Sequence, residues 1–182
     1  MAKVSDRSLY RKIQVVVEEI GKGKISSLEA FLKAVQGHIC FTYYKKEDEP
    51  KECNKKTIER VLLLAIQLGL IEENAWEVTE KVGARAVNRE QFSSVLRQRI
   101  RAVLKSKGLP FDALIEAIQK ILDNARSGIV PSWDNIYNSL TETYGDKMAV
   151  ERKEFHTLLT LLSHADGIGY SQKRIYLPYK PE

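Results

Sequence analysis

The sequence has little cysteine and no long apolar run. Its only cysteines are Cys40 and Cys53, too few for the disulfide framework of a small secreted protein. The longest strongly apolar stretch, 61–71, is interrupted by Gln67 and falls far short of the roughly 20 residues that a membrane-spanning helix needs. The first six residues do not resemble a signal peptide. We therefore expect a cytoplasmic protein that has no membrane partner.

The sequence also lacks the patterns that carry most enzyme chemistry. It has no glycine-rich phosphate loop and no nucleophile beside a recognisable base. Asp134, Glu151 and Lys153 loosely imitate a nuclease pattern, but both acids fall at predicted helix starts, where acidic residues stabilise any helix. His38 and the two cysteines offer three zinc ligands without an evident fourth. We predict a protein that is not an enzyme and that holds no metal or cofactor.

What the chain does have is basic charge, concentrated in one segment. The 182 residues carry a net charge of +5. Segment 89–107 holds six basic residues and one acid, Glu90, so its own net charge is also +5. The apolar residues of this segment recur at helical spacing, whereas Arg97, Arg101 and Lys105 follow one another every four residues on the opposite side. The pattern predicts an amphipathic basic helix whose polar face suits phosphate groups.

Two copies of one helical order flank this segment. Landmarks at 23–28 and 58–65 of the first copy align with 128–133 and 155–162 of the second. Apolar spacing and capping residues predict helices over 6–20, 26–36 and 55–68 in the first copy, and within 110–128, 130–145 and 151–167 in the second. Asn54 and Gly69 are expected to begin and end the third helix of the first copy. Short strands are expected at 70–71 and 76–79, and within 168–178.

The stretch LGLIEENAWEVTEKVG, residues 68–83, resembles the end of a winged-helix domain, in which the third helix stops at a glycine and a small hairpin follows. The resemblance implies a mainly α (α+β) fold class: a tandem repeat of two winged-helix domains, a helix-turn-helix variant. They would occupy residues 1–88 and 108–182 and be joined by the amphipathic basic helix at 89–107.

In a DNA-binding domain of this kind the third helix enters the major groove. Together with the basic segment, the resemblance predicts a protein that binds double-stranded DNA, as a regulator or as a DNA-maintenance or defence component. The candidate nucleic-acid-binding residues are Arg97, Arg99, Arg101 and Lys105 in the basic helix, Arg152, Lys153, His156 and Thr160 in the last predicted helix, Lys173 and Arg174 in its hairpin, and Lys55, Lys56 and Arg60 in the first copy. The polar side of the last helix fits an ordinary solvated surface equally well.

The alternative is a protein–protein adaptor, similar in domain order to the tandem winged-helix subunits of bacterial SMC complexes. The third helix of the first copy is apolar on nearly all sides. Leu63 and Ile66, with Tyr43 and Tyr44 beside them, are therefore candidate interface residues, since burying each extra aliphatic side chain contributes about 1.5–3 kcal/mol. This surplus predicts a homodimer or a larger complex.

Overall fold

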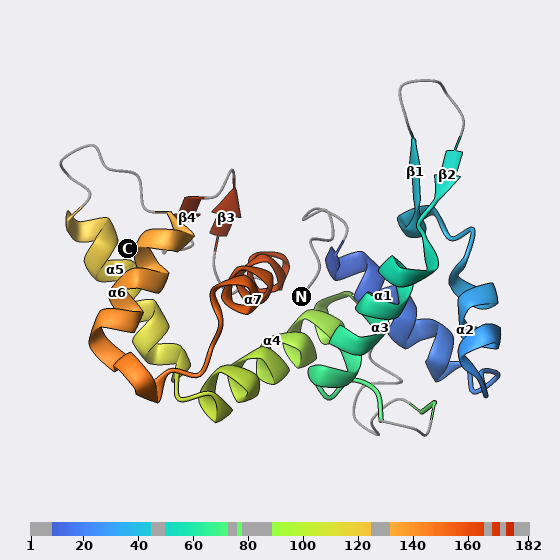
Figure 1. Cartoon of the computed structure of the whole chain (residues 1–182), viewed down its shortest axis with the longest axis horizontal. Coiled ribbons are helices and arrows are strands. Elements are labelled where there is room, and N and C mark those ends of the chain that lie inside the picture. The colour runs from blue at the N-terminus through green and yellow to red at the C-terminus, as the bar shows by residue number, and fades with distance from the viewer. Residues whose placement is uncertain are drawn as a thin grey trace. The chain divides into compact units, whose positions relative to one another are not determined.

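The computed structural model describes residues 9–44, 50–72, 76–77, 89–124, 132–165, 169–171 and 174–176 (Figure 1). The chain divides into two compact units, residues 1–96 and 97–182. The division falls inside one helix, α4 (Arg89–Ser106), whose first half belongs to unit 1 and whose second half belongs to unit 2. The sequence instead predicted a separate linker over 89–107.

Unit 1 is built around α1 (Leu9–Gly21), which contacts α2 (Leu28–Val35), α3 (Lys55–Gln67) and the 3-10 turn η2 (Ile39–Phe41). Nine of the 13 residues of α1 are buried, among them Lys12 and Gln14. The run of three valines explains this position, because it places apolar side chains on more than one side of the helix. Such a helix is stable only where neighbours cover it from several directions.

The helix boundaries of unit 1 follow the local signals in the sequence. The side chain of Ser27 caps α2 by accepting from the backbone N–H of Ala30 at 3.2 Å. Asn54 caps α3 in the same way, accepting from the N–H of Thr57 at 2.9 Å. Gly69 follows the end of α3 with a φ of +65°, a conformation that glycine adopts without steric penalty. The predicted beginning of α3 at Asn54 and its end at Gly69 are confirmed.

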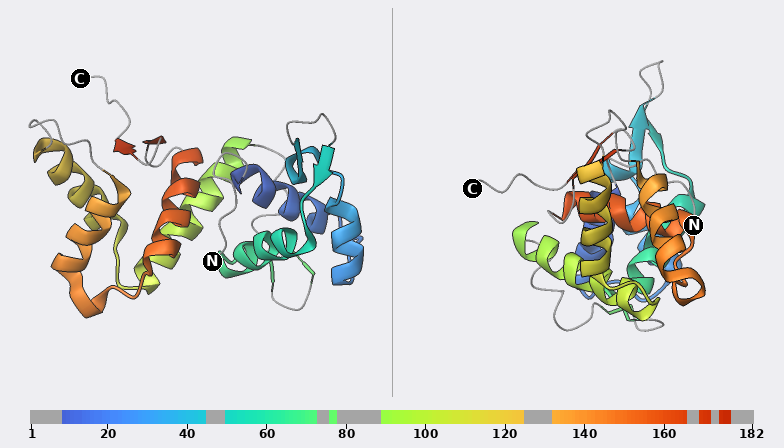
Figure 2. Two further views of the ribbon diagram at one scale, coloured as in Figure 1. Left: turned by 45° about the horizontal axis from the view of Figure 1, so that its top comes forward. Right: turned by 90° about the vertical axis from the view of Figure 1, so that its left-hand side faces the viewer.

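A hairpin that the sequence did not predict precedes α3. Strands β1 (Thr42–Tyr44) and β2 (Pro50–Glu52) pair antiparallel, with Tyr43 opposite Lys51. The ladder rises away from the helices of unit 1 (Figure 2). At its base the N–H of Cys53 donates to the carbonyl of Phe41 at 2.6 Å, so η2 is tied to the residue before the cap of α3.

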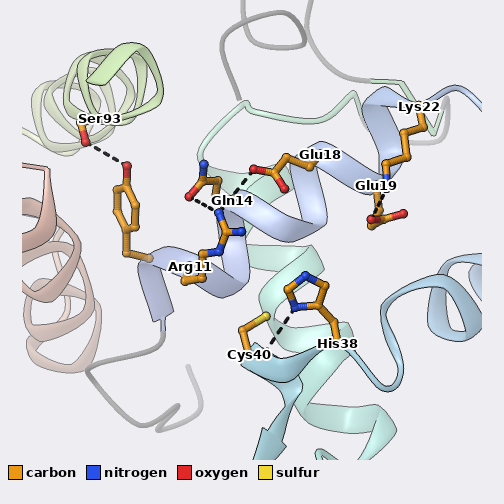
Figure 3. Close-up of polar contacts among 9 residues, drawn as sticks. Arg11, Gln14, Glu18, Glu19, Lys22, His38, Cys40 and Ser93 are labelled. Atoms are coloured by element: carbon orange, nitrogen blue, oxygen red, sulfur yellow. Dashed lines mark hydrogen bonds and ion pairs between the residues drawn. The ribbon is translucent and has the colours of Figure 1, made fainter. Parts of the chain in front are cut away.

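The first half of α4 completes the core of unit 1. Phe92 and Leu96 are fully buried, and the ring of Phe92 meets Tyr10 of α1 edge-on at 5.4 Å. Beside this contact the hydroxyls of Tyr10 and Ser93 share a buried hydrogen bond of 2.9 Å, drawn dashed at Ser93 in Figure 3. Two buried hydroxyls that satisfy each other fix the register of α4 against α1.

Unit 2 contains the second half of α4 with α5 (Phe111–Asn124), α6 (Trp133–Tyr144), the turn η5 (Gly145–Lys147) and α7 (Arg152–His164). Two strands, β3 (Gly169–Ser171) and β4 (Arg174–Tyr176), pair antiparallel after α7. Helix α6 contacts both α5 and α7, and the strands contact α7 and α5. The core is made of the apolar sides of these helices.

Gly108 makes the turn from α4 into α5. Its φ is +76°, and a Cβ at this position would collide with the backbone carbonyl oxygen of Lys147. Next to this close approach the N–H of Ala149 donates to the carbonyl of Lys107 at 2.9 Å. Only glycine fits both the left-handed conformation and the lack of space, so the end of α4 lies directly against η5.

The predicted fold class, two winged-helix domains, is wrong: the described chain is a helical protein. A winged helix needs a β wing packed after its third helix. In unit 1 the only described ladder precedes α3, and the buried Leu70 and Ile71 fill the helical core after Gly69. In unit 2 the described strands form only a two-stranded ladder of three residue pairs. Such a ladder is marginal by itself, so helix packing determines this fold.

Candidate nucleic-acid interface

The second half of α4 presents a row of cations. Ile100 and Leu104 are fully buried, whereas Arg101 and Lys105 are exposed and Arg97 is half-exposed. Successive members of this row are four residues apart, so each is turned by about 40° from the last around the helix. We call Arg97, Arg101 and Lys105 the α4 cationic face. The exposure that the sequence predicted for these three residues is confirmed.

The α4 cationic face forms no ion pair within the described part of the chain. The ion pairs of unit 2 lie elsewhere: Lys107 contacts Glu154 at 3.0 Å, and Arg152 pairs with Asp134. None of the ion pairs among described side chains includes a member of the α4 cationic face, or Arg99, which is half-exposed on the same helix. The charges of the face are therefore not committed to a described ion pair and can attract an anion.

One member of the face is held in place by an aromatic ring. The guanidinium carbon of Arg101 lies 4.2 Å from the centre of the Phe111 ring, at the start of α5. A guanidinium over an aromatic ring keeps its charge and its N–H donors. Arg101 is thus ordered before any anion binds, which lowers the conformational entropy lost on binding.

The start of α7 carries a second cluster, which the sequence did not predict. The rings of Trp133 and His156 are 4.9 Å apart, and the guanidinium of Arg152 lies 5.3 Å from the centre of the Trp133 ring. The Nε of Arg152 donates to Asp134 at 2.8 Å. These contacts join the first turns of α6 and α7, with Arg152 and His156 as part of the joint. Lys153 is exposed beside them.

The hydroxyl groups of α7 bond to the backbone of their own helix. Thr160, a predicted nucleic-acid-binding residue, is only 2% exposed, and its hydroxyl donates to the carbonyl of His156 at 2.9 Å. The hydroxyls of Thr157 and Ser163 likewise donate to carbonyls of their own helix. Thr160 is therefore not on the exposed polar face that the sequence predicted, because the leucines on either side of it are buried and it lies in the core with them.

The other predicted nucleic-acid-binding residues are distributed over both units. Lys173 lies outside the described residues, and Arg174 is in β4 opposite Ser171. In unit 1, Lys55, Lys56 and Arg60 are all exposed on α3. They belong to a different unit from the α4 cationic face.

The predicted interface residues differ in exposure. Leu63 is 54% exposed in the middle of α3, and Ile66 is half-buried one turn later. Tyr43 and Tyr44 are in β1, paired with β2. Leu28, which is not among the predicted interface residues, is 42% exposed. It is the first residue of α2.

The cysteine region shows no sign of reactive or metal-binding chemistry in the described residues. Burial raises the pKa of the Cys40 thiol from 9.0 to about 11, so the thiol remains protonated near neutral pH. The Nδ1 of His38 accepts from the backbone N–H of Cys40 at 3.4 Å (Figure 3). No group of three or more potential metal ligands occurs among the described residues.

No helix in the described ranges is both long enough and apolar enough to cross a bilayer.

Comparison with known proteins identifies no relative. No protein-family model, no curated protein and no solved structure matches the chain.

Proposed function

We propose that the protein binds double-stranded DNA through the sugar–phosphate backbone, using the α4 cationic face as its main contact. The observation that carries the proposal is the set of three cations, Arg97, Arg101 and Lys105, on one side of a helix with no described acid paired to them. The whole net charge of the chain is equal to the surplus in segment 89–107. Contacts of this kind give affinity without sequence preference.

The dimensions of the face suit a phosphate backbone. The axial rise from Arg97 to Lys105 is about 12 Å, at about 1.5 Å per residue. Over the same length a duplex carries about seven phosphate charges, at one per 1.7 Å of axis. Phosphates outnumber the three cations, so the face can bind in many registers. Base reading by α7 forms no part of this proposal, because Thr160 is buried.

A salt titration with duplex DNA tests the proposal. Changing Arg97, Arg101 and Lys105 together to glutamine should weaken binding to all duplexes alike. The slope of log affinity against log salt should become shallower by about 2–3, since each phosphate contact contributes about 0.9. The buried stripe of α4 is untouched by these changes, so the helical circular dichroism should be preserved.

The matched control removes the same charge elsewhere. Lys24, Lys33 and Lys120 are exposed and lie outside α4, and their joint change to glutamine should leave the slope within about 0.5 of the parent. A second variant, Arg101→Lys, keeps the charge and loses the planar group over Phe111. It should retain the slope and lose affinity. If the two triple variants behave alike, or if the parent does not bind duplex DNA at low salt, the proposal is wrong and the adaptor alternative takes its place.

A further inference from the structure

A second surface in unit 1 combines exposed apolar and basic side chains. The exposed large apolar residues of the described chain are Leu28, Ile39 and Leu63, all in unit 1. Leu63 differs from the other two because it sits in the middle of a regular helix, flanked by Leu62 and Leu64, which are buried. A leucine side chain that stays in solvent contributes no hydrophobic stabilisation to its own unit. A partner that covered Leu63 would remove this apolar surface from water, and its burial would stabilise the complex.

The neighbours of Leu63 on α3 define the chemistry of this surface. Lys56, Arg60 and Leu63 follow one another at i, i+4 and i+7, so they share one side of the helix. Half-buried Ile66 extends the apolar part by one turn. We call these four residues the α3 outer face. Including the flanking Lys55 and Glu59, the helix carries three cations and one acid here, and none of these charges is ion-paired within the described chain.

Three kinds of occupant could cover this face. Duplex DNA would satisfy the cations, but its phosphates offer nothing apolar for Leu63 and Ile66. A second copy of the chain would bring the apolar residues, but a symmetric contact would also bring its own surplus of positive charge to the same place. An acidic amphipathic helix satisfies both parts of the face, with apolar side chains against Leu63 and Ile66 and carboxylates near Lys56 and Arg60.

We infer that the α3 outer face is a docking site for an acidic amphipathic helical segment of another protein. Leu63 is the central apolar anchor, and Lys56 and Arg60 select the acidic partner. The site lies in unit 1 and is separate from the α4 cationic face, whose charged residues belong to unit 2. The inference uses no residue of the proposed DNA-binding surface.

Fluorescence anisotropy with a defined peptide tests this inference on the full chain. The probe is a fluorescein-labelled peptide of about 16 residues, with leucines at i, i+3, i+4 and i+7 and glutamates between them. A version with lysines in place of the glutamates is the peptide control. We expect the acidic peptide to bind at least about tenfold more tightly than the basic one, because the cations of α3 attract only the former.

Matched variants locate the peptide on α3. Leu63→Asp and Arg60→Glu should each weaken the acidic peptide by about tenfold or more, and both positions are exposed, so folding should be retained. Leu28→Asp and Lys33→Glu make the same chemical changes on α2 and should alter affinity by less than about twofold. The triple glutamine variant of the α4 cationic face should bind the peptide as the parent does.

Four results would overturn the inference. The first is no peptide binding by the parent at about 100 µM, a dissociation constant equivalent to roughly −5.5 kcal/mol. The second is an equal loss of affinity in the α2 controls. The third is loss of duplex binding in Leu63→Asp and Arg60→Glu, which would assign the face to nucleic acid. The last is a parent dimer in sedimentation that Leu63→Asp converts to a monomer, which would assign it to a second copy of the chain.

Discussion

Substitution of Gly108 by alanine should destabilise unit 2 strongly. The residue has a φ of +76°, and an alanine in the left-handed region costs about 1–2 kcal/mol. The new Cβ would also collide with the carbonyl oxygen of Lys147, which can retreat only by disturbing the 2.9 Å hydrogen bond between Ala149 and Lys107. Loss of that bond adds about 1 kcal/mol, and the steric displacement adds more. We expect a total of about 2–4 kcal/mol.

The assay uses one tryptophan per unit. Trp133 is in α6 of unit 2, and Trp76 packs on Phe31 of unit 1 with ring centres 5.9 Å apart. In a Trp76→Phe background, urea unfolding followed by the fluorescence of Trp133 reports unit 2. With a slope near 1.5 kcal/mol per molar urea, the midpoint should fall by about 1–3 M in Gly108→Ala.

The control is Gly23→Ala, read through Trp76 in a Trp133→Phe background. Gly23 has a φ of +67°, close to that of Gly108, but nothing lies within 4 Å of the position that its Cβ would take. It should show only the conformational cost of about 1–2 kcal/mol. Should Gly108→Ala lose no more stability than this control, the close contact between the end of α4 and η5 does not exist in solution.

Three further outcomes follow from individual contacts. In a Cys53→Ser background, Cys40 should be alkylated at pH 8 about a hundredfold more slowly in the native chain than in urea. Its raised pKa of about 11 against 9.0 also predicts stability that is full below pH 9 and lost as pH rises from 9 through 11. Tyr10→Phe and Ser93→Ala should each cost about 1 kcal/mol in unfolding titrations and less than additively together, because each removes the same buried hydrogen bond. Asp134→Asn should change the unfolding free energy by less than about 1 kcal/mol, because its ion pair is largely exposed; a larger loss would show that the cluster at the start of α7 is a structural anchor.

Local signals in the sequence were sufficient to place the helices. Ser27 and Asn54 cap their helices, and Gly69 follows the end of α3, because each acts on backbone groups within a few residues of itself. The exposed row on α4 was predictable for the same reason: the periodicity of one helix separates its buried and exposed sides. The α4 cationic face therefore needed no knowledge of the rest of the chain.

Contacts between distant residues account for the failures. Whether a short strand pairs depends on its partner, so β1 and β2, which lie in a charged loop, were not predicted. The strands expected within 168–178 are present as β3 and β4, but they do not make the unit a winged-helix domain. Arg152 and Asp134 are 18 residues apart in the sequence, and their pairing produces no periodic pattern of residues from which it could be predicted. Thr160 looked available in a polar pattern, but burial on two sides of α7 is a property of the assembled unit.

The division of α4 between two cores has a consequence for how the chain folds. Starting a helix is the unfavourable step, because several residues must be ordered before the first backbone hydrogen bond forms, whereas extending it adds one bond per residue. When either unit folds, its half of α4 becomes a template from which the other half can grow without a new nucleation event. The two units therefore support each other's folding through a shared backbone, even though Phe92 and Leu104 are buried in different cores.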